Sequence, residues 1–495
     1  MIKSSKIIVT ALLLIIVGYF FRPWFHGSLM GIYKHPLTFI IPLIIILYVA
    51  ISVKKIIRQS SESGYKSLQT QKTMGFLVTG FVGIFILSGI LSGIESDVAH
   101  YINSKEVTLT NRVTLPEIDK LRLLPKQVAT RYGQDSLQNP QEYLGDSQIV
   151  MVDGKQERVF PRLPDGGLLY FIKKLNGFIT VDVSELDKKA EIIDQEFKYS
   201  ERIGVFDNIY FQLYKKKYWV DFVNQPIYLK DPQTQKWVTV VPYIKYQNFP
   251  IRTPYWGGFM TVESDGTITD YKPEDAQTLP LTQGNRVQPK EIARFYTESY
   301  AYKNGLINYW FIHKDQPAID EFNYGDQPFH ISTQEGYKQF IVTRPTGSSY
   351  GIFKIFIFDA TTGKAEIIEY NQDSLLTGPV ASLDYAQKQF PEIDYNNFSL
   401  DEPRPITSKG RLYWLISIVG SNSAGIAKNV VVDAQTTKVT SFQNKQEIED
   451  FINSGKVITK PVTETKTSTS EDIQNKIKSI QDQLEQLKSS IKELK

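Results

Sequence analysis

The sequence predicts an α+β protein with three N-terminal transmembrane helices, extracytoplasmic modules of one helix plus an antiparallel sheet, and a C-terminal coiled-coil helix. Three observations predict this class: apolar runs near the N-terminus, a helix-then-strands pattern that recurs along the middle of the chain, and a heptad repeat at its end. The expected divisions are a membrane domain (1–95), a first α+β module (96–200), a β-rich segment (201–285), a second module (286–375), a third module (376–457), a linker (458–471) and a coiled coil (472–495).

The membrane domain rests on the apolar runs Ile7–Phe21, Leu37–Val53 and Met74–Ile94. A spanning helix needs roughly 17–25 mostly apolar residues. The first run also fits a cleaved signal peptide, because Lys3 and Lys6 precede it. No small-x-small cleavage site follows this run, so we expect it to be retained as an anchor.

The distribution of basic residues predicts the orientation of the membrane domain. The loop between the second and third runs contains one acid, Glu62, against five basic residues: Lys54, Lys55, Arg58, Lys66 and Lys72. The loop between the first two runs has only Arg22 and Lys34. Basic loops stay in the cytoplasm. The expectation is a multi-pass cell-membrane protein with a cytoplasmic N-terminus and an extracytoplasmic C-terminal domain.

The third run contains small residues spaced four apart, which would let another helix approach closely: Ser88, Gly89, Ser92 and Gly93. Glycine is also simply common in membrane helices. No charged residue lies inside any of the three runs. Since ion or proton translocation usually needs one, a transporter is disfavoured.

The composition excludes several function classes. The formal net charge of +3 is small for 495 residues, so nucleic acid is not an expected partner. The chain has no cysteine, which excludes disulfides, thiolate zinc sites and a thiol nucleophile. A large exported part without disulfides suits a prokaryotic cell envelope. The aromatic content of 13% favours strands.

The middle of the chain repeats one pattern, in which a helix precedes several strands. Helices are predicted at Leu124–Leu137, Pro289–Tyr302, about Ser382–Phe390 and Lys445–Ile452. Strands are predicted at Leu168–Ile172, Gly177–Val183, Lys236–Tyr246, Leu306–His313, Tyr337–Thr343, Ile352–Phe358, Leu412–Val419 and Asn429–Val432. Asp265-Gly266 predicts a hairpin turn.

Two segments, Ile355–Lys364 and Val430–Lys438, echo each other as a buried strand, an Asp-Ala turn, a Thr-rich tip and a returning strand. An aspartate in such a turn accepts hydrogen bonds from the following backbone N–H groups. A ligand or metal role for Asp359 and Asp433 would need a second carboxylate or histidine nearby, and the sequence supplies none at ligand spacing.

This turn resembles the PepSY domain of metallopeptidase propeptides and spore germination proteins. The similarity covers mainly residues 378–456 and 337–370, and Val431-Val432-Asp433-Ala434 matches the family's strand and turn. Thr437 stands where the family usually has glycine, whereas Gly363 keeps it in the earlier copy. The resemblance implies a small PepSY/cystatin-like α+β fold that binds or restrains a partner, often a peptidase. It implies no catalytic residue.

The tail predicts self-association. Lys460–Glu471 is rich in Thr, Ser, Lys and Glu, which is typical of a flexible linker. An uninterrupted a/d seam follows, formed by Ile473, Ile477, Ile480, Leu484, Leu487, Ile491 and Leu494. Because so short a helix is marginal alone, it should pair with copies of itself or with a partner helix. The alternative is a lone amphipathic helix on a surface.

The search for chemistry identifies no catalytic, cofactor-binding or metal-binding residue. The five histidines are His26, His35, His100, His313 and His330, and none lies in a known catalytic motif. The aromatic, lysine-rich segment Tyr210–Trp219 is interpreted as an edge strand protected by lysines, with a glycan- or nucleic-acid-stacking surface as the alternative. Tyr255 and Trp256 are expected in an exposed turn, as a contact surface.

These observations lead to three functional hypotheses. The first is a non-enzymatic, membrane-anchored envelope protein that holds a protein partner and self-associates through its tail. The second is a surface hydrolase or glycan-processing enzyme whose dispersed carboxylates converge in space. The third is a PepSY-like regulator of a peptidase. The expected partners are the lipid bilayer, a homo-oligomer or coiled-coil partner, and an envelope protein or peptidase, without nucleic acid or a cofactor.

Overall fold

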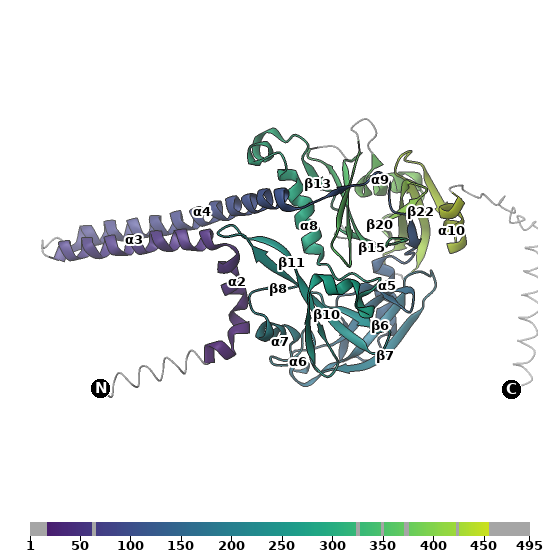
Figure 1. The fold of residues 1–495 in the computed structure, drawn as a ribbon, viewed down its shortest axis with the longest axis horizontal. Coiled ribbons are helices and arrows are strands. Elements are labelled where there is room, and N and C mark those ends of the chain that lie inside the picture. Colours follow the sequence, from purple (N-terminus) through teal and green to yellow (C-terminus); the bar gives the residue numbers. More distant parts are fainter. Residues whose placement is uncertain are drawn as a thin grey trace, which may run out of the picture. The chain divides into compact units, whose positions relative to one another are not determined.

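The computed structural model describes residues 17–61, 66–322, 327–347, 351–370, 376–421 and 425–454. The chain divides into two compact units, Met1–Lys445 and Gln446–Lys495. Helix α10 (Lys445–Ser454) carries the described residues of the second unit, and its position matches the predicted helix Lys445–Ile452. The first unit mixes helices with mainly antiparallel sheets (Figure 1), which confirms the α+β class.

The first unit begins with helices. They are η1 (Arg22–Phe25), α2 (His26–Lys34), α3 (Pro36–Ser61) and α4 (Lys66–Glu106). Helices α3 and α4 lie side by side (Figure 1). Helix α2 meets α3 at a bend of 88°. The bend falls at His35, whose ψ is 61°, because a residue that precedes proline is forced out of the helical conformation.

One helix of the described residues, Val82–Glu106, is long and apolar enough to cross a membrane. Arg22–Lys34 and Pro36–Ser52 would form a second span only if the bent pair counts as one. Most of the run Ile7–Phe21 lies outside the described residues, as does the heptad segment 472–495. Three spans and a coiled coil therefore stay predictions.

The small residues of α4 divide between two environments. Ser88 Oγ donates a hydrogen bond to the Thr38 carbonyl of α3 at 3.3 Å. Gly89 and Gly93 are exposed, and a Cβ added at either position would meet nothing within 4 Å. Ser88 thus contacts α3, whereas packing of the glycine edge against another chain stays a prediction.

The strands of the described residues form four larger sheets. The first has the order β3-β5-β6-β7, with β4 on β5. Its strands are β3 (Glu142–Leu144), β4 (Gln148–Val152), β5 (Lys155–Pro164), β6 (Leu175–Asp182) and β7 (Ala190–Phe197). The second has the order β12-β11-β10-β8, with β9 on β10. Its strands are β8 (Asp221–Phe222), β9 (Ile227–Lys230), β10 (Trp237–Gln247), β11 (Thr253–Val262) and β12 (Ile268–Tyr271).

The third sheet has the order β1-β18-β17-β15-β14-β2, with β13 on β15. Its strands are β1 (Thr110–Asn111), β2 (Ile118–Lys120), β13 (Pro317–Ile319), β14 (Phe329–Thr333), β15 (Gly336–Pro345), β17 (Lys354–Asp359) and β18 (Ala365–Glu369). The fourth runs β20-β21-β22-β23, and a separate pair joins β16 to β19. Their bounds are β16 (Gly351–Ile352), β19 (Leu376–Thr377), β20 (Phe398–Ser408), β21 (Arg411–Gly420), β22 (Ile426–Asp433) and β23 (Val439–Phe442).

Strands β1 and β2 connect the segment that follows α4 to the third sheet. Both precede the first sheet in the chain, yet they form the two edges of the third sheet. Strand β1 pairs in parallel with β18, and β2 pairs antiparallel with β14. The residues that follow β2 are therefore held where the first, third and fourth sheets approach one another.

Three predicted helices are confirmed, as α5 (Lys126–Ser136), α8 (Lys290–Ser299) and α9 (Pro379–Gln389). The remaining short helices are α6 (Leu169–Ile172), α7 (Ile209–Lys216), η2 (Pro273–Gln277), η3 (Pro280–Thr282), η4 (Tyr300–Tyr302) and η5 (Asn308–Ile312). The end of α4 contacts α8, where Asn103 Nδ2 donates a hydrogen bond to Ser299 Oγ at 2.9 Å.

The predicted turns are also confirmed. Gly266, in the hairpin between β11 and β12, has a φ of +91°. In the echoed hairpins, Asp359 Oδ1 accepts the Thr362 N–H at 2.7 Å and Asp433 Oδ1 accepts the Gln435 N–H at 2.8 Å. Both aspartates therefore cap their own turns. Thr437 adopts the left-handed conformation (φ +59°) that glycine provides in the first copy.

Three predicted strands are wrong. Leu168–Ile172 contains the one-turn helix α6, and Leu306–His313 contains the π-helix η5. The predicted edge strand Tyr210–Trp219 is largely helix α7. Its helix starts because Asn208 Oδ1 accepts the N–H groups of the first turn, a cap that outweighs the aromatic strand propensity.

Candidate anion-binding cavity

A cavity of about 180 Å³ lies among the first, third and fourth sheets. We call it the arginine cavity and define it by its basic lining residues: Arg122, Lys126, Arg158, Arg286, Lys290 and His330. This space is roughly ten times what one water molecule requires. A smaller hollow of about 10 Å³ shares Arg122 and His330 and adds Lys120 and Arg404.

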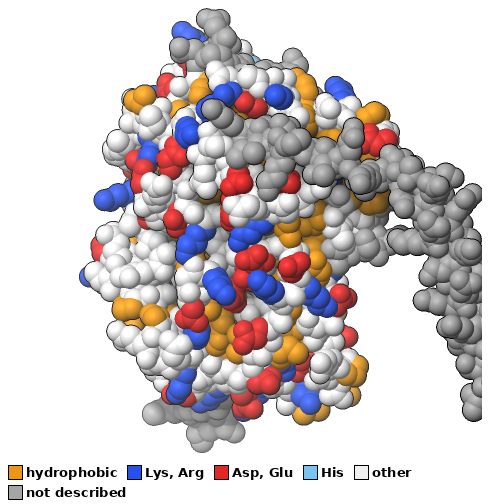
Figure 2. Space-filling model, turned by 90° about the vertical axis from the view of Figure 1, so that its right-hand side faces the viewer, with side chains coloured by type: hydrophobic (Ala, Val, Ile, Leu, Met, Phe, Trp, Pro, Cys, Tyr) orange, Lys and Arg blue, Asp and Glu red, His pale blue; other side chains and the backbone are white. Residues whose placement is uncertain are grey.

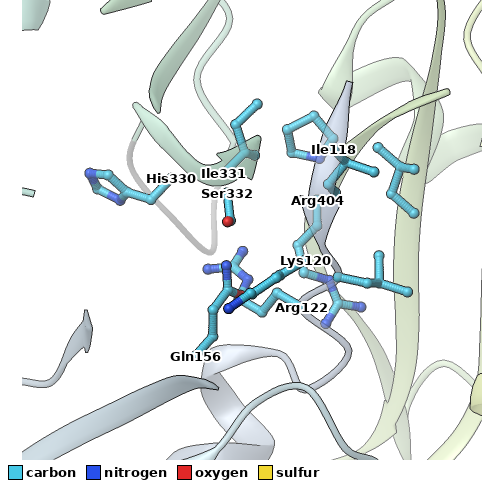
Figure 3. A pocket seen from close by; sticks show the side chains of 11 residues that line it. Ile118, Lys120, Arg122, Gln156, His330, Ile331, Ser332 and Arg404 are labelled. Carbon is cyan, nitrogen blue, oxygen red and sulfur yellow. The ribbon is translucent and has the colours of Figure 1, made fainter. Parts of the chain in front are cut away.

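Segments that are distant in sequence supply these side chains. Arg122 follows β2, Arg158 lies in β5, and Arg286 lies in the loop before α8. His330 comes from β14 and Arg404 from β20. In the smaller hollow, Lys120, Arg122 and Gln156 converge below Ser332, and His330 lies to one side (Figure 3).

A β-bulge aims the acidic and basic groups of β20 at the cavity. The register between β20 and β21 shifts between Asp401 and Arg404, and Glu402 has a φ of +29°. Bulges re-aim side chains and often lie beside functional sites. Glu402 lines the arginine cavity, and Arg404 lines the smaller hollow.

Glu402 balances part of the positive charge. Its Oε1 lies 2.6 Å from Arg122 Nη2, and its Oε2 accepts the Lys126 backbone N–H at 3.2 Å. Burial alone would raise the pKa of Glu402. The guanidinium charges of Arg122, Arg158 and Arg404 outweigh burial and hold this pKa at about 2. Glu402 is therefore ionised at all physiological pH values.

Arg158 and Arg286 are buried without a carboxylate partner among the described residues. Arg158 Nη1 donates to Ser147 Oγ at 3.1 Å, and its buried Nε has no hydrogen-bond partner there. Arg286 Nη2 donates to Gln148 Oε1 at 2.8 Å. Their relative exposures are 4% and 6%. Burial lowers the pKa of Arg158 to about 10, so the side chain still carries its charge at pH 7.

Arg404 is equally buried, at 3% exposure, and also lacks a carboxylate within ion-pair distance in the described part of the chain. It donates to the Leu123 carbonyl and to Ser417 Oγ, both at 2.6 Å. Burial lowers its pKa to about 10. The partners of these arginines are neutral, so they satisfy hydrogen bonds without cancelling charge.

Positive charge is in excess around the two hollows. Seven Lys and Arg residues line them, against the two carboxylates of Asp146 and Glu402. The face shown in Figure 2 carries Lys and Arg side by side with Asp and Glu. In three larger hollows, by contrast, a lining cation is paired with a carboxylate: Arg294 with Glu321, Arg162 with Glu142, and Lys354 with Glu369. The excess thus belongs to the arginine cavity.

The ring of His330 is held neutral at this site. Burial, followed by the positive charges of Arg286, Arg122 and Lys290, lowers its pKa well below 6.5. Its Nε2 is buried and has no hydrogen-bond partner among the described residues. A neutral imidazole with an unused nitrogen can contact a bound ligand without adding charge.

The arrangement suits anion binding better than acid–base catalysis. A general acid needs a pKa near the working pH, whereas Glu402 has a pKa of about 2 and is bonded to Arg122. Within the described residues, no group of three His, Cys, Asp or Glu side chains could hold a metal ion. Buried guanidinium groups are instead the usual receptors for phosphate and carboxylate.

Asp401 gives the site a measurable pH dependence. Burial and then the charge of Glu402 raise the pKa of Asp401 to about 6, above its ordinary 3.8. The folded protein thus binds this proton more tightly than the unfolded chain, so the unfolding free energy should rise as pH falls from 7.5 to 5. This contribution is about 1 kcal/mol at pH 5.

The measurement is urea unfolding of the wild-type protein and Asp401→Asn at both pH values. The difference in unfolding free energy between the two proteins should change by about 1 kcal/mol between pH 7.5 and pH 5, because the other titrating groups contribute equally to both proteins. Equal pH dependence in both proteins would contradict the assignment.

The predicted site residues that the structure describes do not line this cavity. Tyr255 and Trp256 lie within β11, and Trp256 is 8% exposed with its Nε1 bonded to the Gly258 carbonyl at 3.0 Å. The expected exposed turn is therefore wrong. The heptad residues lie outside the described residues.

Sequence reasoning missed all of the cavity arginines. The available signal was arginine inside otherwise buried strands, as in Arg158-Val159-Phe160 and Arg404-Pro405-Ile406. An arginine in a buried strand needs a reason, because charged side chains are almost never buried unless paired. Neither a protein-family model nor a curated protein sequence matches this chain.

Proposed function

We propose that this chain is a membrane-anchored extracytoplasmic binding protein whose ligand is a small phosphate- or carboxylate-bearing anion in the arginine cavity. One observation carries the proposal: Arg158 and Arg286 in the cavity, and Arg404 in the adjoining smaller hollow, are buried without a carboxylate within ion-pair distance among the described residues. An isolated charge in a protein interior costs several kcal/mol. A bound anion supplies the missing negative charge and removes part of that cost.

The geometry around the cavity fits such a ligand. Guanidinium groups present paired N–H donors that match the oxygen spacing of phosphate and carboxylate. Helix α8 begins at Lys290 without a side-chain cap, so the positive end of its dipole also lies at the cavity. The volume of about 180 Å³ suits a ligand with few heavy atoms, well below the size of drug-like molecules.

Other parts of the proposal rest on the sequence. Anchoring in a prokaryotic cell membrane is supported by the apolar runs and the basic loop between them. Self-association is supported by the heptad tail, and a protein partner by the PepSY resemblance. The hydrolase alternative is weaker, because the carboxylates at this cavity are outnumbered by cations and Glu402 is bonded to Arg122.

The test is thermal unfolding of the full chain in mild detergent with added phosphate, pyrophosphate or citrate. One of these anions should stabilise the wild-type protein, by about 2.7 kcal/mol at one hundred times its Kd. Arg158→Met should raise the melting temperature without ligand, because it removes one of three buried cations that share the single carboxylate of Glu402. The same variant should lose most of the response to the anion.

Arg411→Met is the matched control, since Arg411 is 43% exposed and pairs with Asp433 outside the cavity. It should keep the wild-type response. The proposal is wrong if no anion stabilises the protein, or if Arg158→Met and Arg411→Met respond alike.

A further inference from the structure

We propose that an apolar surface at the base of the α3–α4 hairpin rests in the lipid headgroup layer, so that the folded part sits directly on the membrane. We call it the apolar collar and define it by Trp24, Phe25, Leu29, Ile307, Phe311 and Ile312. The inference rests on the membrane anchoring given under Proposed function. The collar shares no residue with the arginine cavity, and it contacts lipid rather than a small anion.

The collar residues are strongly exposed for apolar side chains. Phe311 is 76% exposed, Ile307 68% and Ile312 62%, all in or beside the π-helix η5. Trp24 and Phe25 of η1 are 59% and 54% exposed. Scattered surface apolar residues need no explanation, but contiguous ones mark a surface that meets a protein or a membrane.

The start of α3, which directly follows α2, and the helix η5 contact α4 at the same height. Just after α2 ends, Thr38 Oγ1 donates a hydrogen bond to Glu95 Oε2 at 2.8 Å. Beside Phe311, Trp310 Nε1 donates to Asp97 Oδ2 at 2.7 Å. Glu95 and Asp97 are two residues apart, which is about 3 Å along a helix axis. The junction of α2 with α3 and the helix η5 are thus held at one level of the hairpin.

This level is where the hydrocarbon of a membrane should end. The apolar run of α4 finishes at Ile94, and the acids Glu95 and Asp97 follow at once. Tryptophan and other aromatic residues prefer the membrane–water interface, where an apolar ring meets polar groups. Trp310, with its N–H bonded to Asp97, has both environments.

Helix α2 has the orientation and the two faces of an interfacial helix. It meets α3 at 88°, so it lies in the membrane plane if α3 crosses along the membrane normal. One face is fixed to the second sheet region: His26 contacts the Val220 carbonyl at 2.9 Å, and Lys34 pairs with Asp221 at 2.9 Å. The other face exposes Leu29 and Ile32. Such a helix buries its apolar face at the headgroup boundary.

The absence of cysteine in the chain allows a direct test. Single cysteines are introduced as Leu29→Cys and Phe311→Cys, with Val113→Cys, at a 94% exposed position, as the aqueous control. The full chain is reconstituted in phosphatidylcholine–phosphatidylglycerol vesicles and labelled with a nitroxide. Collision with oxygen, which concentrates in lipid, is compared with collision with a water-soluble nickel chelate.

The expected result is that labels at 29 and 311 collide several-fold more with oxygen than with the nickel chelate, whereas the label at 113 shows the reverse. If the protein resists carbonate extraction but the labels at 29 and 311 behave like the one at 113, the collar does not contact lipid. The proposal for the collar is then wrong, and the membrane anchoring is unaffected. If the labels are shielded from both agents and their spectra are broadened by a neighbouring nitroxide, a second chain covers the collar, and the proposal of a lipid contact is wrong. If carbonate extracts the protein, the proposed membrane anchoring is wrong, and so is the proposal for the collar.

Discussion

Replacing Glu402 with glutamine is expected to lower the unfolding free energy by about 3–5 kcal/mol. Glutamine keeps the shape of the side chain and removes its charge. Arg122, Arg158 and Arg404, whose charges hold the pKa of Glu402 at about 2, then share the interior without its carboxylate. The measurement is urea unfolding of the purified full chain in mild detergent at pH 7.5.

Two companion variants identify the cause of this loss. Glu366→Gln also removes a carboxylate bonded to an arginine, but Glu366 is 32% exposed and Arg112 keeps its second partner, Glu335. This control should cost less than about 1 kcal/mol. Adding Arg158→Met to Glu402→Gln should recover part of the stability, because it removes one uncompensated cation. A double variant no more stable than Glu402→Gln would contradict the charge argument.

Trp414→Ala should cost about 3–5 kcal/mol, as for other large aromatic residues deleted from a core. Trp414 is fully buried in β21. Its Nε1 donates to the Thr377 carbonyl at 2.8 Å, and its ring lies 5.5 Å from that of Phe329. Phe329 begins β14 and lines the arginine cavity, so the loss should also weaken anion binding.

The same unfolding experiment, with the anion titration repeated at a temperature where the variant is folded, checks both effects. Val113→Ala is the control, since Val113 is 94% exposed and its truncation should change the unfolding free energy by no more than about 0.5 kcal/mol. A Trp414→Ala protein with wild-type stability would show that the contact between β14 and β21 contributes little.

Elements with strong local signals could be predicted from the sequence. Helices α5, α8 and α9 follow the spacing of their apolar residues, and the hairpin at Gly266 follows its Asp-Gly turn. Errors arose where a local cap or tertiary packing outweighed residue propensity. Asn208 starts helix α7 in a segment rich in strand-forming aromatics, and the apolar residues of η5 lie exposed rather than in a buried strand.

The candidate site could not be predicted in the same way. Arg122, Arg158, Arg286 and Arg404 span nearly 300 positions of the chain, and each is unremarkable in its own segment. Their proximity depends on β2 crossing to the third sheet and on the bulge of β20. Neither event leaves a periodic pattern in the sequence, because both arise from pairing between distant strands.

By itself, the sequence determined the α+β class, the positions of most helices and turns, the absence of thiol chemistry, and the apolar runs that predict a membrane anchor. These properties follow from composition and short-range periodicity, which act within one or two turns of chain. Only the tertiary structure decided that four arginines share one interior region with too few carboxylates, and that η5 and the start of α3 contact α4 at one height. Charge balance and surface shape depend on which distant residues become neighbours, and packing alone determines that.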